Sequence, residues 1–171
     1  MNARPWLLAV TSLSLFAGCN SSGPTPTAVP ATAPSKHVLS EAPADAKSVI
    51  EAKKSAVDGE EVTVVGRIGG SVTPFVAGRP TFTLVDTSLV PCNERAGDSC
   101  KTPWDYCCDT DQLPKAMVVV KIVDDSGAPV ALDAKKDLGM KELQTIIVHG
   151  KAKRDDSGNL SILTPAVFIK K

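Results

Sequence analysis

The chain has 171 residues, with 19 basic and 19 acidic side chains, so its formal net charge is zero. That length fits one domain with appendages. Proteins that bind nucleic acids usually carry a clear basic excess, which displaces counterions from phosphates. Aromatic residues make up only 4% of the chain, so few bases or sugar rings could be stacked on them. These values predict that nucleic acid is not a partner.

The first 18 residues have the features of an export signal. Arg4 precedes an apolar run over residues 6–16, which is shorter than the roughly 20 helical residues that span a bilayer. The run ends in Leu-Phe-Ala-Gly-Cys19, which resembles the lipobox of bacterial lipoproteins, where the cysteine is acylated and becomes the N-terminus. We therefore expect a lipoprotein signal peptide over residues 1–18, a lipid on Cys19, and an exported protein anchored to the cell envelope. The alternative is an ordinary secretory signal with a chance cysteine.

Three further segments follow the signal. Residues 19–42 are rich in Pro, Thr, Ala and Ser, which predicts an extended tether without a core of its own, and we expect His37 to be solvated there. Residues 43–58 predict a short helix, because apolar residues recur at helical spacing and Asp58-Gly59 would end it. Residues 59–171 are expected to form the folded domain.

From residue 60 onward the apolar period changes to two, which indicates β-strands. Gly66 predicts a bulge or sharp bend in the first strand, and Pro165 an irregularity in the last. One short helix is expected within residues 130–143. The five expected strands cover residues 62–68, 81–86, 116–123, 145–153 and 160–170.

Three strands, a partly helical connection and a final hairpin follow the order of the OB-fold, a five-stranded Greek-key barrel. The expected fold is therefore all-β with one or two short helices, and an OB-fold-like barrel with an insertion between its second and third strands. The alternatives are a small open β-sandwich and another type of barrel.

Four cysteines lie in that insertion: Cys92, Cys100, Cys107 and Cys108. Export favours disulfides, and adjacent cysteines seldom bond to each other because the small ring strains the peptide between them. Cys92 and Cys100 would then each pair with one member of the adjacent pair, which leaves two connectivities open. A thiolate metal site and a redox-active pair are the alternatives. The spacing matches neither the usual zinc knuckles nor Cys-x-x-Cys, so we expect disulfides and no metal or other cofactor.

Trp104, Asp105 and Tyr106 are candidate ligand-binding residues in the same insertion. They could form an aromatic platform with an acidic acceptor for a sugar or a peptide. Alternatively, Trp104 covers one end of the barrel as a hydrophobic lid, with a partner for the Tyr106 hydroxyl nearby. We favour the lid.

Arg67 and Arg79 are the remaining candidate ligand-binding residues, because both are expected on the groove side of the sheet. Each could instead pair with an acid, Asp86 or Asp105. His149 is expected to be packed or solvated, and the aspartates of residues 124–125 and 155–156 to support turns. The chain shows no Ser-His-Asp order, phosphate loop or paired catalytic carboxylates, so we expect no enzyme.

Four segments of the chain together resemble a family of uncharacterised exported OB-fold-like lipoproteins from planctomycete-type bacteria. They are residues 66–70 (Gly-Arg-Ile-Gly-Gly), 74–75 (Pro-Phe), 84–86 (Leu-Val-Asp) and 103–108 (Pro-Trp-Asp-Tyr-Cys-Cys). The resemblance covers about residues 45–171, and the last segment is its most specific part. That family has no established activity, so the resemblance implies an architecture and no catalytic residues. More loosely, the domain looks like periplasmic bacterial OB-fold binding modules, which generally lack this insertion.

The resulting hypothesis is a lipid-anchored cell-envelope interaction module without enzymatic activity. Its expected partners are the membrane, through the lipid, and an envelope glycan or protein. One alternative is a thiol-based metal-binding or redox protein that uses the four cysteines. The other is a single-stranded nucleic-acid-binding OB-fold.

Overall fold

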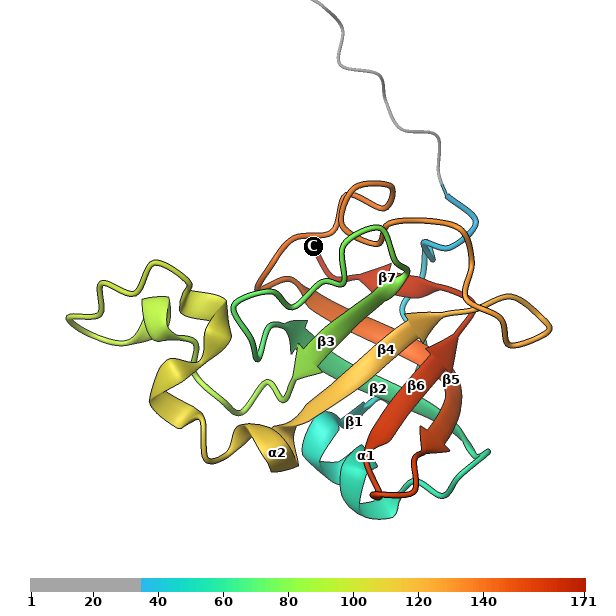
Figure 1. Cartoon of the computed structure of the whole chain (residues 1–171), viewed down its shortest axis with the longest axis horizontal. Coiled ribbons are helices and arrows are strands. Elements are labelled where there is room, and N and C mark those ends of the chain that lie inside the picture. Colours follow the sequence, from blue (N-terminus) through green and yellow to red (C-terminus); the bar gives the residue numbers. More distant parts are fainter. Residues whose placement is uncertain (1–34) are drawn as a thin grey trace, which may run out of the picture. The chain divides into compact units, whose positions relative to one another are not determined.

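A computed structural model describes residues 35–171, whose strands form a closed five-stranded barrel (Figure 1). Neighbouring strands are antiparallel, except that the third and fifth strands of the barrel run parallel. Around the barrel the order is β2 (Glu61–Ile68), β3 (Thr81–Val85), β4 (Met117–Ile122), β6 (Leu160–Thr164), β5 (Thr145–Arg154) and again β2. This order and closure are those of the OB-fold, so the predicted fold class is confirmed.

The strands form where the sequence alternates between apolar and polar residues. In β2 and β4, every second residue is buried, and the residues between them are partly exposed or exposed. Because strand side chains point alternately to the two faces, this pattern places one apolar row inside the barrel. The largest fully buried side chains of the barrel interior are Phe82, Ile68, Leu84, Ile122, Ile146 and Ile162.

Gly66 allows β2 to lie close to its neighbours. The pairing of β2 with β5 runs without interruption through Gly66, which faces Ile146, so the predicted bulge is wrong. A Cβ atom on Gly66 would lie 2.9 Å from both the Leu84 Cβ and the Val85 carbonyl oxygen. The glycine is therefore required by the close approach of β3.

Pro165 marks a true irregularity, as the sequence predicted. β5 pairs Lys151 with Leu163 of β6 and then Val148 with Val167 of β7 (Val167–Ile169). Three residue steps along β5 therefore match four steps along the β6–β7 segment, which is a β-bulge. The Thr164 hydroxyl is 2.8 Å from the His149 carbonyl and 2.6 Å from the Ala166 carbonyl, and supports the bulge.

The helix before the barrel, α1 (Val49–Ser55), is shorter than the predicted 43–58. It begins at a capping box, in which the Ser48 hydroxyl accepts from the Glu51 amide and the Glu51 carboxylate accepts from the Ser48 amide. Asp45 has a left-handed φ of 56°, which keeps the chain before Ser48 out of the helix. The two residues Lys47–Ser48 instead form β1, parallel to β2. Val49 and Ala52 of α1 are buried in the barrel core.

The connection between β4 and β5 contains turns, and the helix predicted within residues 130–143 is wrong. The Asp133 carboxylate accepts hydrogen bonds from the amides of Lys135 and Lys136, and Leu143 has a φ of 65°. Such local side-chain bonding competes with a helix. Buried Ala134 and Met140 nevertheless pack against the barrel core.

The end of the expected tether contacts the barrel. Val38 forms a parallel bridge with Val167, and His37 Nδ1 lies 2.7 Å from the Pro165 carbonyl oxygen. His37 is thus partly buried against the β6–β7 bulge. The signal peptide, Cys19 and the earlier part of the tether lie outside the described residues. In the described part of the chain, no helix has the length and apolar character needed to cross a membrane.

Candidate functional site: a thiol cluster in the insertion

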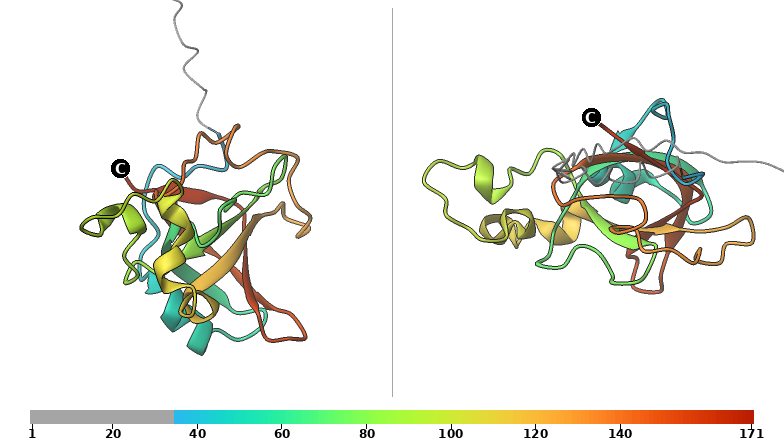
Figure 2. Two further views of the ribbon diagram at one scale, coloured as in Figure 1. Left: turned by 60° about the vertical axis from the view of Figure 1, so that its left-hand side comes forward. Right: turned by 90° about the horizontal axis from the view of Figure 1, so that it is seen from above.

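The insertion, residues 87–116, leaves the barrel where Val85 of β3 faces Met117 of β4. Figures 1 and 2 show it projecting away from the barrel, without strands of its own. Its elements are the short 3-10 helices η1 (Cys92–Glu94), η2 (Pro103–Asp105) and η3 (Cys107–Asp109), followed by α2 (Leu113–Ala116).

Gly69 and Gly70, directly after β2, contact the insertion. The Gly70 amide donates to the Trp104 carbonyl at 2.8 Å. A Cβ atom on Gly69 would lie 2.5 Å from that same carbonyl oxygen and 2.8 Å from the Tyr106 ring. The indole N–H of Trp104 also donates to the Val72 carbonyl at 3.0 Å. The glycine pair therefore accommodates η2 against the barrel.

Two ion pairs fix the ends of the 3-10 helices. Arg67 of β2 contacts Glu94 of η1 at 2.8 Å, and Arg95 pairs with Asp109 at the end of η3. The first pair connects the insertion to the barrel, and the second connects η1 to η3. Together they hold Cys92 and Cys107, which start these two helices, on facing segments.

Three thiols and one carboxylate meet between these helices. The Cys92 and Cys107 sulfurs are 3.5 Å apart, and those of Cys100 and Cys107 are 3.9 Å apart. One carboxylate oxygen of Asp105 joins them, and all four donor atoms lie within 4.8 Å of one another. Cys92 is fully buried, whereas Cys107 is exposed. We call these four residues the thiol cluster.

Asp105 is positioned by its own loop. Its Oδ2 accepts from the Thr102 hydroxyl at 2.8 Å, and its Oδ1 accepts from the Cys107 amide at 2.9 Å. Asp98 bonds in the same way to the amide of Cys100, two residues further on. The sequence carried this signal as a repeated Asp-x-Cys, which the cysteine spacing alone did not reveal.

The pKa of the Cys107 thiol is raised well above its usual value. The hydrogen bonds with the Cys92 and Cys100 sulfurs contribute most, followed by burial and the negative charge of Asp105. The Cys107 sulfur is therefore protonated at neutral pH while the cluster holds no cation.

The predicted disulfides are not confirmed, because no two of the four sulfurs are at bonding distance in the described chain. The geometry does favour one of the two connectivities. Cys108 forms a second group with Cys92 and Asp98, again within 4.8 Å, whereas Cys100 and Cys108 share no such group. Bridges Cys92–Cys108 and Cys100–Cys107 would thus need the smaller movements.

Trp104, Asp105 and Tyr106 do not form a common platform, because each side chain has a different environment. Trp104 is partly exposed beside the chain after β2, so the lid that we favoured is not Trp104. Tyr106 is fully buried and packs with Val85 and Leu89 in a second apolar cluster. The backbone turns inward there because Tyr106 has a left-handed φ of 56°.

The Tyr106 hydroxyl is buried without a hydrogen-bond partner among the described residues. Burial raises the pKa of Tyr106, and the nearby Arg67 guanidinium opposes this only in part. The partner that we expected for this hydroxyl is therefore missing from the described chain.

Arg67 and Arg79 are not brought together. Arg67 faces Val85 at one end of β3, whereas Arg79 is exposed in the turn before the other end. Neither arginine pairs with Asp86, which is buried. The Asp86 carboxylate instead accepts a hydrogen bond from the Ile50 amide at the start of α1, with an N–O distance of 2.7 Å. Burial by itself raises the pKa of Asp86, but the hydrogen bonds from Ile50, Ser88 and Ser48 outweigh it and lower that pKa overall.

The remaining polar residues have structural contacts. His149 is exposed and lies 3.0 Å from the Thr63 hydroxyl on the neighbouring strand. Asp124 and Asp155 accept backbone amides within their own turns, as predicted.

No family model and no curated protein matches the chain. Among solved structures, it is similar to the crystal structure of the mitochondrial single-stranded DNA-binding protein from S. cerevisiae. The identity is 12%, the match covers 67% of this chain and 98% of that one, and the TM-score is 0.36.

This finding overturns the exclusion of nucleic acid as a partner. The exclusion was based on zero net charge and few aromatic residues, yet the similar yeast protein binds single-stranded DNA. DNA binding itself is a property of the yeast protein.

Proposed function

We propose that this chain is an exported, lipid-anchored OB-fold protein whose insertion binds a thiophilic metal ion. The observation that carries the proposal is the thiol cluster, with three sulfurs and one carboxylate oxygen mutually within 4.8 Å. Cys92, Cys100, Cys107 and Asp105 would be the ligands. This modifies the sequence-based expectation of no metal, which rested on spacing along the chain.

The sulfur distances suit a tetrahedral site. A Zn–S bond of about 2.3 Å gives an edge of about 3.8 Å between two sulfurs of a tetrahedron. The Cys92–Cys107 and Cys100–Cys107 sulfur distances, 3.5 and 3.9 Å, lie on either side of that value. Thiolate ligands favour Zn²⁺ and Cu⁺ over harder cations such as Mg²⁺ and Ca²⁺.

The ligand set supports a holding role. Four protein donors complete a tetrahedron, whereas catalytic zinc sites keep one position open for water or substrate. The insertion also lacks a large core, so a bound ion would cross-link η1, η2 and η3. The protein is accordingly proposed to bind metal without catalysis.

The experiment is a titration of the reduced protein with Co²⁺ and then Zn²⁺ under anaerobic conditions. One Co²⁺ per chain with sulfur-to-metal charge-transfer absorption, displaced by Zn²⁺, is expected. Cys107→Ser should abolish that absorption, because Cys107 contacts both other sulfurs. Cys108→Ser is the matched control, since Cys108 is adjacent to Cys107 and groups with Cys92 and Asp98 but not with all four donors of the cluster. Absence of charge transfer in the wild type, or an equal loss in both variants, would contradict the proposal.

Membrane anchoring is a separate part of the proposal and rests on the lipobox-like end of residues 1–19. Cells fed a labelled fatty acid should incorporate it into the wild-type protein and not into a Cys19→Ala variant. Equal labelling of both proteins would remove Cys19 as the anchor.

A further inference from the structure

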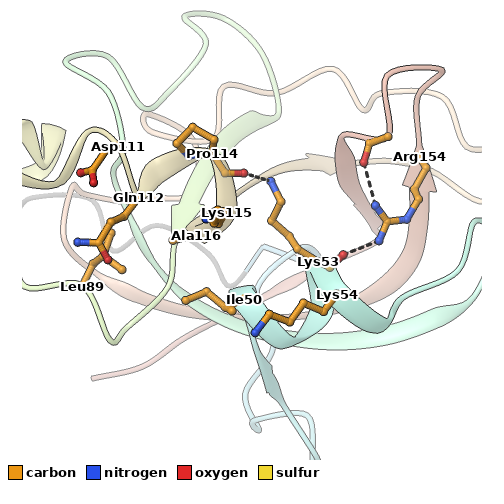
Figure 3. Close-up of a pocket in the computed structure, with 11 residues that line it drawn as sticks. Ile50, Lys53, Lys54, Leu89, Asp111, Gln112, Pro114, Lys115, Ala116 and Arg154 are labelled. Carbon is orange, nitrogen blue, oxygen red and sulfur yellow. Dashed lines mark hydrogen bonds between the residues drawn. The ribbon is translucent and has the colours of Figure 1, made fainter.

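A second site lies between α1 and α2, away from the sulfurs (Figure 3). This α1–α2 pocket has a volume of about 570 Å³, within the usual range for small-molecule sites. Ile50 of α1 and the buried residues Leu89 and Ala116 supply an apolar part of its lining.

The rest of the lining is strongly cationic. Lys53, Lys54, Lys115 and Arg154 face the pocket, and Asp111 is the only acidic residue among the lining residues. The whole chain has no net charge, so this excess is local.

Two of these cations, Lys53 and Arg154, donate hydrogen bonds to backbone carbonyls. The Lys53 amine donates to the carbonyls of Pro114 and Met117 at 2.8 and 2.9 Å. The Arg154 guanidinium donates to the carbonyls of Ala56, Lys53 and Gly158 (Figure 3 shows the last two). Both positive charges are thus fixed in place by oxygen atoms that carry no formal charge.

No carboxylate forms an ion pair with any of these four cations in residues 35–171. The Asp58 carboxylate accepts a hydrogen bond from the Arg154 backbone amide, but its ion-pair partner is Lys153. Burial and the neighbouring Arg154 charge lower the pKa of Lys53, in keeping with a cation that has no paired carboxylate. An anion in the pocket would supply the missing negative charge.

We propose that the α1–α2 pocket binds an amphipathic anion, with a phosphate or carboxylate head and a short alkyl arm. Lys54 and Lys115 have no side-chain partner among the described residues, and Lys53 keeps one N–H free, so each of these three amines can donate to an anion in the pocket. Arg154 donates three of its five N–H groups to backbone carbonyls, so its main contribution to the pocket is its fixed positive charge. The apolar lining from Ile50 and Leu89 receives the arm. This site is independent of the thiol cluster, so either proposal can fail alone.

The test is calorimetric titration of the protein with octyl phosphate, inorganic phosphate and octyl glucoside. Octyl phosphate should bind at least tenfold more tightly than either of the others, because only it carries both the charge and the arm. Lys54→Gln and Lys115→Gln should each weaken it about tenfold, the value of one modest charge-assisted hydrogen bond. Lys141→Gln removes an exposed charge elsewhere and should leave the affinity unchanged.

Equal affinity for octyl phosphate and octyl glucoside, or an equal loss in Lys141→Gln, would overturn the proposal. Competition by vesicles of phosphatidylglycerol, and not of phosphatidylcholine, would identify the anion as a lipid head group. Competition by soluble octanoate alone would identify a free carboxylate. Both of these results support the pocket.

Discussion

The barrel and the insertion maintain their structures by different means. The barrel has continuous strand ladders and an apolar core whose residues recur every second position. The insertion has three short 3-10 helices, one buried aromatic ring and four thiols. A barrel of this kind is stable without a cross-link, whereas a segment with so little core depends on one. Changes to one region should therefore leave the other largely unaffected.

The largest effect is expected from the barrel core. Phe82 is fully buried and stacks near Phe75, with ring centroids 6.2 Å apart. Phe82→Ala should lower the free energy of unfolding by about 3–5 kcal/mol, because it leaves a cavity. Urea denaturation measures this change, and Co²⁺ binding by the fraction that remains folded should be unaltered. A loss below about 1 kcal/mol would show that the core is not the source of stability.

The next effect concerns the insertion alone. Oxidised glutathione should convert the four thiols of the metal-free insertion to Cys92–Cys108 and Cys100–Cys107 bridges. For each bridge, one glutathione disulfide is reduced to two glutathione thiols. Each bridge should stabilise the insertion by about 2–4 kcal/mol and prevent Co²⁺ binding. Peptide mapping by mass spectrometry identifies the bridges. A Cys92–Cys107 bridge would show that the 3.5 Å contact between those sulfurs decides the pairing instead.

A smaller effect is expected at the junction of the two regions, where Asp86 connects the end of β3 to α1. Asp86→Asn should cost about 1–3 kcal/mol at neutral pH, because the Ile50 and Ser88 amides lose a charged acceptor. The pKa of Asp86 is lowered in the folded state, so its contribution is complete above the unfolded pKa of about 4.

That contribution is lost as the pH falls through the folded pKa. Denaturation at pH 7 and at about pH 2 should therefore show the wild type losing its advantage over Asp86→Asn at the lower pH. An advantage that is unchanged over this interval would mean that Asp86 acts by shape and not by charge.

The smallest effect is expected for Tyr106→Phe. The variant removes a buried hydroxyl without a partner in the described structure and keeps the ring that fills the second apolar cluster. Stability should change by less than about 0.5 kcal/mol or increase, since no hydrogen bond is lost. Thermal unfolding measures it. A cost above about 1.5 kcal/mol would show that Arg67 bonds this hydroxyl.

Local sequence patterns predicted the barrel well. The five barrel strands fall on the expected segments, and Pro165 does interrupt the last one, whereas β1 lies where a helix was expected. The errors arose where side chains bond to the nearby backbone. Asp133 disrupts the apolar helical pattern of residues 130–143, and the Ser48–Glu51 capping box delays the start of α1.

The sequence by itself determined the fold class, because a period of two in apolar residues depends only on which face of a strand each residue occupies. It also determined that residues 92–108 would be exceptional, with four cysteines and the Trp-Asp-Tyr segment. Only the tertiary structure decided which of these side chains meet. Their meeting depends on Gly69 and Gly70 receiving η2, on Tyr106 entering the core, and on two ion pairs that align η1 with η3. Such contacts join distant parts of the chain, and no local spacing encodes them.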